Sequence, residues 1–446
     1  MTTSRVGIVG GGALGMSLAL RLREQGHDVV VLEGARTAGG LAASQQIAGY
    51  TWDRFYHVIL QSDRDLLALL SELGVDEPNW GVTRTGFYTD GVLYSLSTSL
   101  EFLAFPPINL IDKMRLAATI VYASRVKNWR SLEKISVSDW LTRLSGKRTF
   151  ERIWLPLLKS KLGENYRIAS AAFIWAIIAR MYAARRSGLK REQFGYVNGG
   201  YATVLARFEK YLEEKGIELR TGAPVTAVRD SGAEAEVTFA DGTSARFDRV
   251  VLTLPANRIS GLVPQLSPSE HERLGRVVYQ GVLCASLLTK KPLASYYVTN
   301  ITDGWVPFTG VIEMTTLVDR KQFGGNSLVY LPRYLAQDDP FWKASDDEVR
   351  EKFLAALERM YPDFSRSDVI EFRVARARDV LAVSTLDYSE TALPPVRTTL
   401  PNTFIVNSAQ IESGTLNLNE TVGLANRQAK VLAPFLISRE PAAANV

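Results

Sequence analysis

The chain of 446 residues is long enough for more than one domain, and its hydrophobic content of 46% argues against a disordered protein. Its single cysteine, Cys284, excludes an intrachain disulfide and a multi-thiolate metal site, and three scattered histidines do not indicate another metal centre. The formal net charge of +5 is not accompanied by a nucleic-acid recognition motif, so nucleic acid is not an expected partner.

The first forty residues predict a strand, a glycine turn, a helix and a second strand. An apolar strand leads directly into the pattern Gly10-x-Gly12-x-x-Gly15, helical spacing follows, and a second apolar strand over 29–32 ends at Glu33. Gly10 allows a tight turn, Gly12 allows a pyrophosphate to approach the backbone, and Gly15 allows the helix to pack closely on the strand. These parts in this order are typical of a dinucleotide-binding βαβ unit.

We expect the start of that helix, from Ala13 and Leu14 onward, to bind phosphate. The N–H groups of a first helical turn are free and lie at the positive end of the helix dipole. After the second strand, Glu33 can accept hydrogen bonds from a ribose 2′-OH and disfavours a 2′-phosphate, but it does not separate NAD from FAD. A short loop with Gly34 and Arg36 then follows.

A second glycine pair, Gly39-Gly40, brings another stretch of backbone near the same ligand. With this pair the chain resembles the large flavoprotein family of amine oxidases, protoporphyrinogen oxidases, phytoene desaturases and UDP-galactopyranose mutases, in which such a doublet approaches FAD. The resemblance implies that FAD is the cofactor and that Gly34, Arg36 and the doublet are among its neighbours. In the family an arginine that helps to hold the cofactor follows the doublet. This chain has Leu41 there, so that contact is absent or is made by another residue.

The rest of the chain alternates between helical and strand-rich stretches. Turn signals at Asp90-Gly91 predict a hairpin, and 98–192 is expected to be mainly helical. The later elements that we expect are a helix over about 201–215, strands over 216–220, 223–228 and 249–255, a hairpin around Asp241-Gly242, strands over 279–289 and 327–331, and a helix over 345–360. Ser345 and Glu348 form the sequence signature of a capping box for that last helix.

Two later segments also resemble the flavoprotein family. Val225 lies in a Val-x-x-Val strand that resembles the one beside the adenine, which implies a backbone contact with the cofactor; the alternative is plain sheet core. The strand over 402–407 resembles the family's last strand, with Asn407-Ser408 in place of the usual Gly-Asp and Asn407 as a hydrogen-bonding substitute. The helix that follows would direct its N-terminus at the flavin, where its dipole stabilises an anionic reduced form. The matching residues at this helix entry are Asn419, Thr421 and Val422.

The resemblance covers nearly the whole chain and implies an α/β fold. It consists of a Rossmann-like FAD-binding domain of the glutathione-reductase-like flavoprotein type and a discontinuous α+β substrate domain. The residues expected in the FAD-binding domain are 1–80, 195–260 and 395–446, and those expected in the substrate domain are 81–194 and 261–394.

Candidate catalytic residues lie in two segments. The segment 49–63 resembles a family segment in which a histidine lies near the flavin, which implies that His57 donates a hydrogen bond to N5 or exchanges a proton with substrate. Arg54 in the same segment could offset charge on a reduced flavin. Lys161 lies in a second stretch that resembles the family and could face the active site. The alternatives are a hydrogen-bonded core histidine for His57 and a solvated helix face for Lys161.

Basic residues gather beside apolar, aromatic-rich segments in two places, 113–130 and 180–191. Three interpretations stay open: a membrane-surface patch with a lipid-linked substrate, a diphosphate site for a nucleotide sugar, and solvated faces of substrate-domain helices. The longest apolar window is shorter than the ~20 residues of a membrane span. A first strand near residue 5 leaves no room for a signal peptide, so we expect a cytoplasmic protein, with peripheral contact at the inner face of the membrane under the first interpretation.

These observations together predict an FAD-dependent oxidoreductase. It would transfer a hydride from a small-molecule or lipid-like substrate to the flavin, by oxidation or desaturation, in a pocket between the two domains. One alternative is a mutase like UDP-galactopyranose mutase, in which the reduced flavin attacks a nucleotide sugar without net electron transfer. Another is a flavin-binding scaffold without turnover. No pattern in the sequence indicates an oligomeric state.

Overall fold

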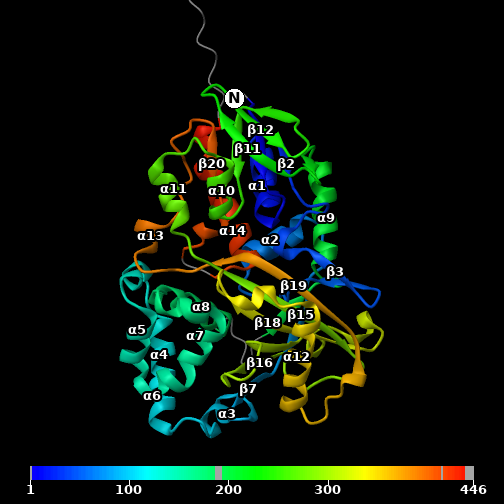
Figure 1. The fold of residues 1–446 in the computed structure, drawn as a ribbon, viewed down its shortest axis with the longest axis vertical. Coiled ribbons are helices and arrows are strands. Elements are labelled where there is room, and N and C mark those ends of the chain that lie inside the picture. Colours follow the sequence, from blue (N-terminus) through cyan, green and yellow to red (C-terminus); the bar gives the residue numbers. More distant parts are fainter. Residues whose placement is uncertain (1–2, 186–192, 413–414, 437–446) are drawn as a thin grey trace, which may run out of the picture.

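In the computed structural model, which describes residues 3–185, 193–412 and 415–436, a five-stranded parallel sheet occupies one end of the molecule (Figure 1). In sheet order its strands are β10 (Glu218–Arg220), β2 (Asp28–Leu32), β1 (Arg5–Val9), β14 (Arg249–Leu252) and β20 (Thr403–Ile405). All neighbouring strands are parallel, so their carboxyl ends lie at one edge of the sheet. This is the Rossmann-like arrangement that the sequence predicts.

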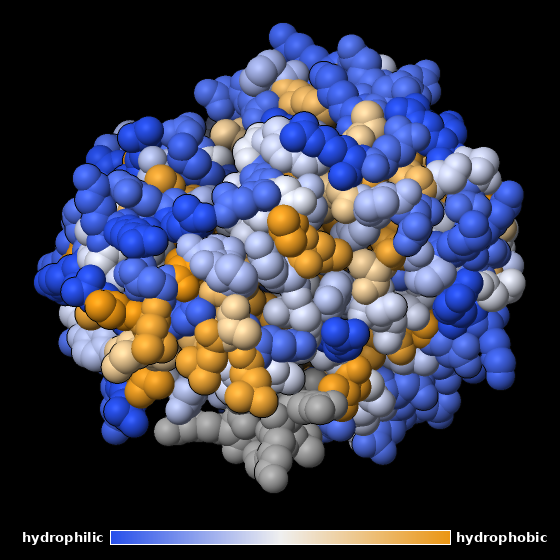
Figure 2. Space-filling model, turned by 90° about the horizontal axis from the view of Figure 1, so that it is seen from below, coloured by the Kyte–Doolittle hydropathy of each residue, from blue (hydrophilic) through white to orange (hydrophobic). Residues whose placement is uncertain are grey.

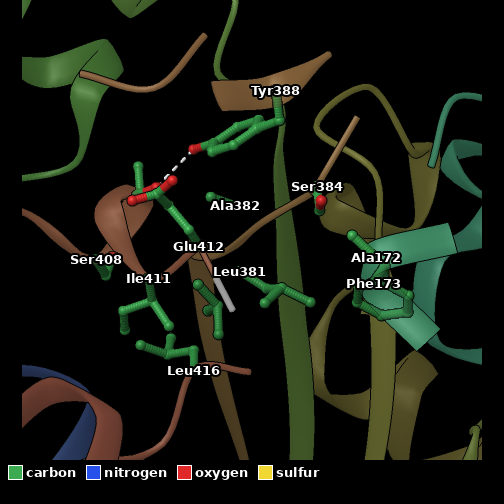
Figure 3. A pocket seen from close by; sticks show the side chains of 12 residues that line it. Ala172, Phe173, Leu381, Ala382, Ser384, Tyr388, Ser408, Ile411, Glu412 and Leu416 are labelled. Carbon is green, nitrogen blue, oxygen red and sulfur yellow. Dashed lines mark hydrogen bonds between the residues drawn. The ribbon is translucent and has the colours of Figure 1, made fainter. Parts of the chain in front are cut away.

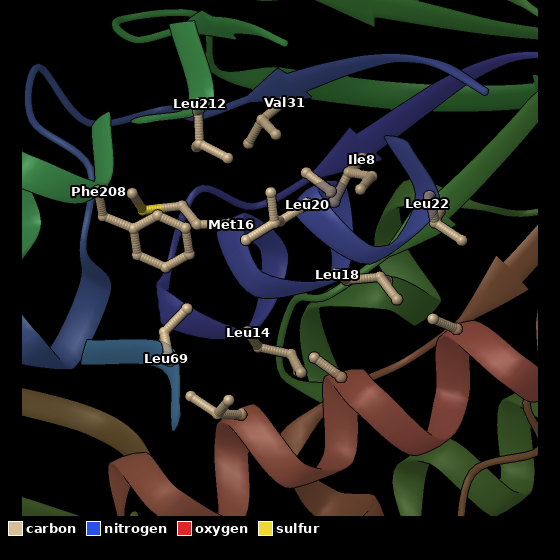
Figure 4. Packing of buried hydrophobic residues seen from close by; sticks show 14 of the residues in the cluster. Ile8, Leu14, Met16, Leu18, Leu20, Leu22, Val31, Leu69, Phe208 and Leu212 are labelled. Atoms are coloured by element: carbon tan, nitrogen blue, oxygen red, sulfur yellow. The ribbon is translucent and has the colours of Figure 1, made fainter. Parts of the chain in front are cut away.

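Both faces of the parallel sheet are covered, which is why its central strands are continuous apolar runs. One face packs against the helices α1 (Ala13–Glu24), α2 (Arg64–Glu72), α9 (Gly200–Glu214) and α14 (Leu418–Leu432). Figure 4 shows Leu14 and Leu18 of α1 directed toward α14, and Met16 toward Phe208 of α9. A helix that is enclosed in this way needs apolar side chains around most of its circumference.

The second face of the parallel sheet packs against a small meander and two helices. They are β11 (Val225–Asp230), β12 (Ala235–Phe239), β13 (Ser244–Phe247), α10 (Ala256–Leu262) and α11 (Pro268–Gly275). The turn between β12 and β13 contains Asp241 and Gly242, so the hairpin expected there is confirmed.

A seven-stranded mixed sheet forms the centre of the other half of the molecule (Figure 1). In sheet order its strands are β19 (Val369–Ala382), β15 (Tyr279–Thr289), β18 (Ser327–Leu335), β17 (Gly310–Glu313), β16 (Val298–Ile301), β7 (Thr85–Thr89) and β8 (Val92–Ser95). One face packs on α12 (Asp346–Met360), whose capping box of Ser345 and Glu348 is present as predicted.

The other face of this sheet packs against the hairpin of β3 (Ser44–Ile47) and β4 (Tyr50–Asp53), which directly follows the Gly39-Gly40 doublet. Trp52 and Phe323 of this contact meet edge to face, with ring centroids 4.9 Å apart. The sheet is therefore positioned over the segment that is expected to contact the cofactor.

A helical cluster stands beside the seven-stranded sheet (Figure 1). It contains α3 (Ser99–Ala104), α4 (Leu110–Ala123), α5 (Val137–Ser145), α6 (Lys147–Thr149), α7 (Leu155–Leu162) and α8 (Ala171–Arg185). The short strands β5 (Ile59–Leu60), β9 (Gln193–Tyr196) and β6 (Asn79–Val82) form a separate small sheet. Among the described residues, no helix combines the length and apolar character that a membrane crossing requires.

Several expected elements differ in length. The strand expected over 249–255 ends at Leu252, and the strand expected over 327–331 continues to Leu335. The last helix, α14, ends at Leu432 and continues as a short 3-10 turn. Pro434 explains the change, because proline has no N–H for the next α-helical hydrogen bond. The domain boundaries drawn from the sequence stay a prediction.

Candidate functional site

The two glycine segments lie side by side at the carboxyl end of β1. The Gly39 N–H donates to the Gly11 carbonyl at 2.8 Å. A Cβ added at Gly15 would lie 1.9 Å from the Gly10 carbonyl oxygen, so this position requires glycine. By contrast, a Cβ at Gly12 would meet nothing nearer than the Cα of Gly40 at 4.0 Å. The backbone of Gly12 therefore borders open space, as an approaching pyrophosphate would require.

The helix α1 begins at this opening without a side-chain cap. Its N-cap is Gly12, which has no side chain to accept from the first turn, so the N–H groups at Ala13 and beyond are free to bind an anion. Ala13 is partly exposed, whereas Leu14 is buried in the core, so only backbone groups of the predicted helix entry are available at Leu14.

Glu33 is fixed beside the same turn by two backbone hydrogen bonds. Its Oε2 accepts from the Gly11 N–H and its Oε1 from the Ala35 N–H, each at 2.7 Å. Each carboxylate oxygen retains a lone pair for a ribose hydroxyl. Gly34 and Arg36 are exposed at the rim of this region. The carboxylate is thus held at the end of β2 in the place that a ribose would need.

The start of β11 lies next to this rim. The Ala223 N–H donates to the Glu33 carbonyl at 2.9 Å, and the Gly222 N–H donates to the Ala35 carbonyl at 2.7 Å. Val225, the first residue of β11, is partly buried and follows directly. Its backbone is therefore close to the residues after β2, as the sequence comparison implied for a neighbour of the adenine.

Asn407, after β20, presents an unsatisfied donor at the same edge of the sheet. The side chain is fully buried, and its Oδ1 accepts from the Ala409 N–H at 3.1 Å. Its Nδ2 has no hydrogen-bond partner among the described residues. Buried polar groups are almost always paired, so an orphaned amide here fits a group that binds beside it. Ser408, which begins a short 3-10 turn, is partly exposed.

The entry to α14 is engaged mainly within the protein. Asn417 caps the helix by accepting from the Glu420 N–H, and Asn419 accepts from the Leu66 N–H at 3.2 Å. The Thr421 hydroxyl donates to the Asn417 carbonyl, and Val422 is buried in the core. Because these side chains are already engaged, the groups that remain available to a cofactor are backbone N–H groups of the first helical turn.

Leu41 and Arg54 are brought close together by the β3–β4 hairpin. Leu41 packs on the hydrophobic cluster beneath the seven-stranded sheet and carries no charge for a phosphate. The Arg54 N–H donates to the Ala43 carbonyl at 3.2 Å, so Arg54 lies beside the segment that follows the doublet. Arg54 as a whole residue is partly buried, and its guanidinium makes no ion pair or hydrogen bond within the described part of the chain.

His57 forms a pair with a buried carboxylate at the edge of a small cleft. Its Nδ1 lies 3.3 Å from Asp53 Oδ2, while Asp53 Oδ1 accepts from the Tyr201 N–H at 2.7 Å. The His57 ring also meets the Tyr201 ring edge to face, with centroids 4.8 Å apart. The cleft is lined by Trp52, Asp53, His57, Tyr196, Tyr201 and Met314, among others. His57 therefore borders a cleft and is not enclosed in the core.

Asp53 is a residue that the sequence analysis missed. It is only 3% exposed and stands at the end of β4, where it fixes both His57 and the first turn of α9. Gly200 is needed there, because a Cβ at that position would lie 2.7 Å from Asp53 Oδ1. The available signal was an acidic residue four positions before a histidine at the end of an apolar strand.

Lys161 is turned toward the seven-stranded sheet. Its Nζ lies 5.2 Å from the ring centroid of Tyr334 on β18, and it makes no salt bridge within the described residues. The Tyr334 hydroxyl is 2.8 Å from the Tyr56 hydroxyl, one residue before His57. Burial and the neighbouring Tyr334 raise the pKa of Tyr56 well above its usual value, so this hydroxyl keeps its proton. Lys159, by contrast, is exposed.

A second, mainly apolar pocket lies between the helical cluster and the segment that follows β20 (Figure 3). Phe173 of α8, Leu381 of β19 and Leu416 line it, together with Ser408. The Tyr388 hydroxyl of α13 (Tyr388–Thr391) donates to the Ala409 carbonyl at 2.7 Å and closes one side. The lining comes from three separate stretches of the chain, 172–173, 380–388 and 408–416, so no local pattern could have revealed it.

The basic cluster at 180–191 is only partly described. Arg180 is engaged in an ion pair with the buried Asp63, with both N–O distances at 3.1 Å. Arg186, Lys190 and Arg191 lie outside the described residues. Arg180 is therefore not available to clamp the diphosphate of a nucleotide sugar.

Comparisons with known proteins agree with this geometry. A sequence model of the flavin containing amine oxidoreductase family matches residues 15–414. Coproporphyrinogen III oxidase from Mycobacterium tuberculosis is 25% identical over 376 residues, which cover 78% of this chain and 80% of that protein. Putrescine oxidase with bound putrescine has a similar fold, with a TM-score of 0.73 at 17% identity, covering 97% of this chain and 99% of that one. Reduced UDP-galactopyranose mutase has a TM-score of 0.74 at 16% identity, covering 100% and 97% of the two chains.

Proposed function

The chain belongs to the flavin-containing amine oxidoreductase family and is an FAD-dependent oxidoreductase, and from this premise we propose which residues hold the cofactor, the proton and the substrate. The residues at the sheet edge fit FAD on three observations. The Gly12 backbone borders open space, α1 begins without a side-chain cap, and the buried Asn407 amide has no acceptor of its own.

In this proposal the pyrophosphate of FAD lies at the start of α1 and the adenosine ribose binds Glu33. Arg54 supplies the positive charge that Leu41 cannot supply, because it is a partly buried residue beside the doublet segment and has no acidic partner among the described residues. An unpaired arginine in a partly desolvated position is most stable beside an anion. Asn407 donates its free amide proton to the cofactor at the other end of the edge.

When bound, the flavin supplies a hydride acceptor for oxidation of a small-molecule substrate. His57 accepts the proton that leaves the substrate. Its Nδ1–H donates to the Asp53 carboxylate at 3.3 Å, and this bond leaves the Nε2 lone pair directed away from Asp53 as a proton acceptor. The His57–Asp53 pair at the cleft is the single observation that carries this assignment.

The substrate side of the site favours an anionic small molecule. Lys161, Tyr56 and Tyr334 form a group of donors without a carboxylate among them, so an anion would satisfy the ammonium and a spare hydroxyl proton. A porphyrinogen that carries carboxylates is consistent with this group and with the coproporphyrinogen oxidase relatives. We therefore propose oxidation of a carboxylated, porphyrinogen-like substrate.

The test is anaerobic mixing of the flavin-loaded protein with coproporphyrinogen III, putrescine or, after prior reduction, UDP-galactopyranose. Loss of the oxidised-flavin absorbance with coproporphyrinogen supports the proposal, and bleaching by putrescine alone overturns the anionic substrate class. Sugar turnover that appears only in the reduced protein establishes the mutase alternative. His57→Gln should slow flavin reduction roughly 100-fold at unchanged flavin content. Lys161→Met should weaken apparent substrate affinity while the limiting rate of flavin reduction is kept.

A further inference from the structure

Two consecutive helices at the end of the molecule that is farthest from the parallel sheet expose large aliphatic side chains. Leu100 and Leu103 of α3 are 78% and 54% exposed, and Leu110, Ile111 and Met114 of α4 are 62%, 63% and 66% exposed. We call these five residues the α3–α4 apolar face. Figure 2 looks at this end of the molecule and shows apolar side chains gathered over one part of it. Scattered exposed leucines are ordinary, but a contiguous group of this kind marks an interaction site.

The helices that carry the face are firmly held. Thr98 and Glu101 form a complete capping box at the start of α3. The Lys113 ammonium donates to the Leu103 carbonyl at 2.6 Å and ties α4 to the end of α3. Between the helices Phe105 is 3% exposed and packs edge to face on Phe87, with ring centroids 5.3 Å apart. The protein therefore anchors the connecting segment in its core and presents the leucines on ordered helices.

The charge of the chain is concentrated in the same region. Residues 98–155, which include α3 to α6, contain ten lysines and arginines and five acidic residues. That surplus of +5 equals the formal net charge of the whole chain, so the remaining residues are neutral overall. Lys147 and Arg148 beside α4 are 81% and 65% exposed at their side chains. Arg115, also exposed, lies on α4 itself, one residue after Met114.

We propose that the α3–α4 apolar face docks on a lipid bilayer that contains anionic lipids. Aliphatic side chains on in-plane helices with a basic surround are the features that such a surface recognises: the side chains enter the acyl boundary and the basic groups pair with lipid phosphates. The five members of the face are aliphatic residues and a methionine, and the exposed aromatic residue near the end of α4, Tyr122 at 51%, is of a type that is enriched at membrane interfaces. The proposal is independent of the substrate.

The experiment is cosedimentation of the flavin-loaded protein with vesicles. Vesicles of phosphatidylcholine with an equal amount of phosphatidylglycerol should bind the protein, and added salt should weaken binding. The triple variant that combines Leu103→Ser, Ile111→Ser and Met114→Ser should bind at least about tenfold more weakly. Three side chains then no longer gain free energy by leaving water for the acyl region. Lys147→Gln with Arg115→Gln should lower affinity for the anionic vesicles only.

A control replaces three exposed apolar residues elsewhere on the surface: Ile370→Ser, Leu386→Ser and Val431→Ser, which are 41%, 42% and 47% exposed. This variant should bind as the unmodified protein does. Absence of binding to anionic vesicles overturns the proposal, as does equal binding by the two serine variants. A dimer that dissociates only in the α3–α4 variant would also overturn it, because the face would then be a subunit interface. Flavin absorbance of each variant verifies folding.

Discussion

Arg180 donates to both carboxylate oxygens of Asp63, each at 3.1 Å, across 117 residues of sequence. Asp63 stands directly before α2, and its carboxylate also accepts from the Leu60 N–H at 2.9 Å. Burial raises the pKa of Asp63, and the attraction of Arg180 lowers it only in part. The pair fastens the helical cluster to the segment that carries His57.

We expect Arg180→Ala to lower the free energy of unfolding by about 3 kcal/mol at neutral pH, because it leaves a buried carboxylate without its partner. The folded-state pKa of Asp63 is already raised, so protonation favours the folded variant and its stability should recover as the pH falls below that pKa. Urea unfolding at several pH values measures this. Arg167→Ala removes an exposed ion pair with Glu164 and should leave the urea midpoint unchanged. A midpoint for Arg180→Ala that equals this control would contradict the expectation.

Gly15→Ala should abolish flavin binding and destabilise the fold, because the new methyl group would lie 1.9 Å from the Gly10 carbonyl oxygen. Gly261→Ala in α10 is the matched control. Its Cβ would have no heavy atom within 4 Å, so the change should be neutral or stabilise the protein by up to about 1 kcal/mol. Bound flavin per chain and the thermal midpoint report both effects. Normal flavin content in Gly15→Ala would mean that the helix can shift away from the turn.

Glu33→Gln should weaken FAD binding to the apoprotein by roughly tenfold or more. The amide is neutral and can accept only through its single oxygen, so one of the two backbone N–H groups at 2.7 Å loses its acceptor and the other loses a charged one. Titration of apoprotein with FAD, followed by flavin fluorescence, gives the dissociation constant. Glu218→Gln at the exposed end of β10 is the comparison, since Glu218 pairs only with Arg220 on the surface. Equal affinities for the two variants would remove Glu33 from the cofactor site.

These positions also show what the sequence could reveal. Gly15, Glu33 and the N-cap at Gly12 belong to one local pattern whose spacing follows from the geometry of a strand, a turn and a helix. The strand β15 was predicted with its observed bounds, and its mainly apolar sequence agrees with a strand that is buried along its whole length. Local rules were sufficient wherever the residues that interact are near neighbours in sequence.

Other parts of the site depend on packing between distant segments. Helical spacing alone could not decide whether Lys161 or Lys159 faces inward; the contact of Lys161 with Tyr334, 173 positions later, decides it. The free Arg54 guanidinium and the apolar cavity beside Ser408 likewise appear only when the strands are assembled. Contacts between residues that are far apart in sequence produce no periodic pattern in the sequence around either residue.

Cys284 should be unreactive in the folded protein. Burial raises the pKa of its thiol, and the side chain is fully enclosed on β15. A thiol reagent such as dithionitrobenzoate should label it only after unfolding. Cys284→Ala should keep its flavin, and denaturation should release the flavin from both proteins. Flavin that stays attached to the denatured unmodified chain but not to Cys284→Ala would show a covalent thioether.

The parallel sheet draws its five strands from positions 5–32, 218–252 and 403–405, with the whole seven-stranded sheet made before the last of them. A nascent chain therefore carries a complete set of strands for the second sheet while its cofactor edge still lacks β20 and the buried Asn407. If Asn407 contacts the flavin as proposed, we expect stable flavin binding to follow the emergence of these residues from the ribosome. Until then the apolar strand β14 lacks the neighbour that pairs with it on one side, and an unpaired apolar strand is a site where incompletely folded chains aggregate.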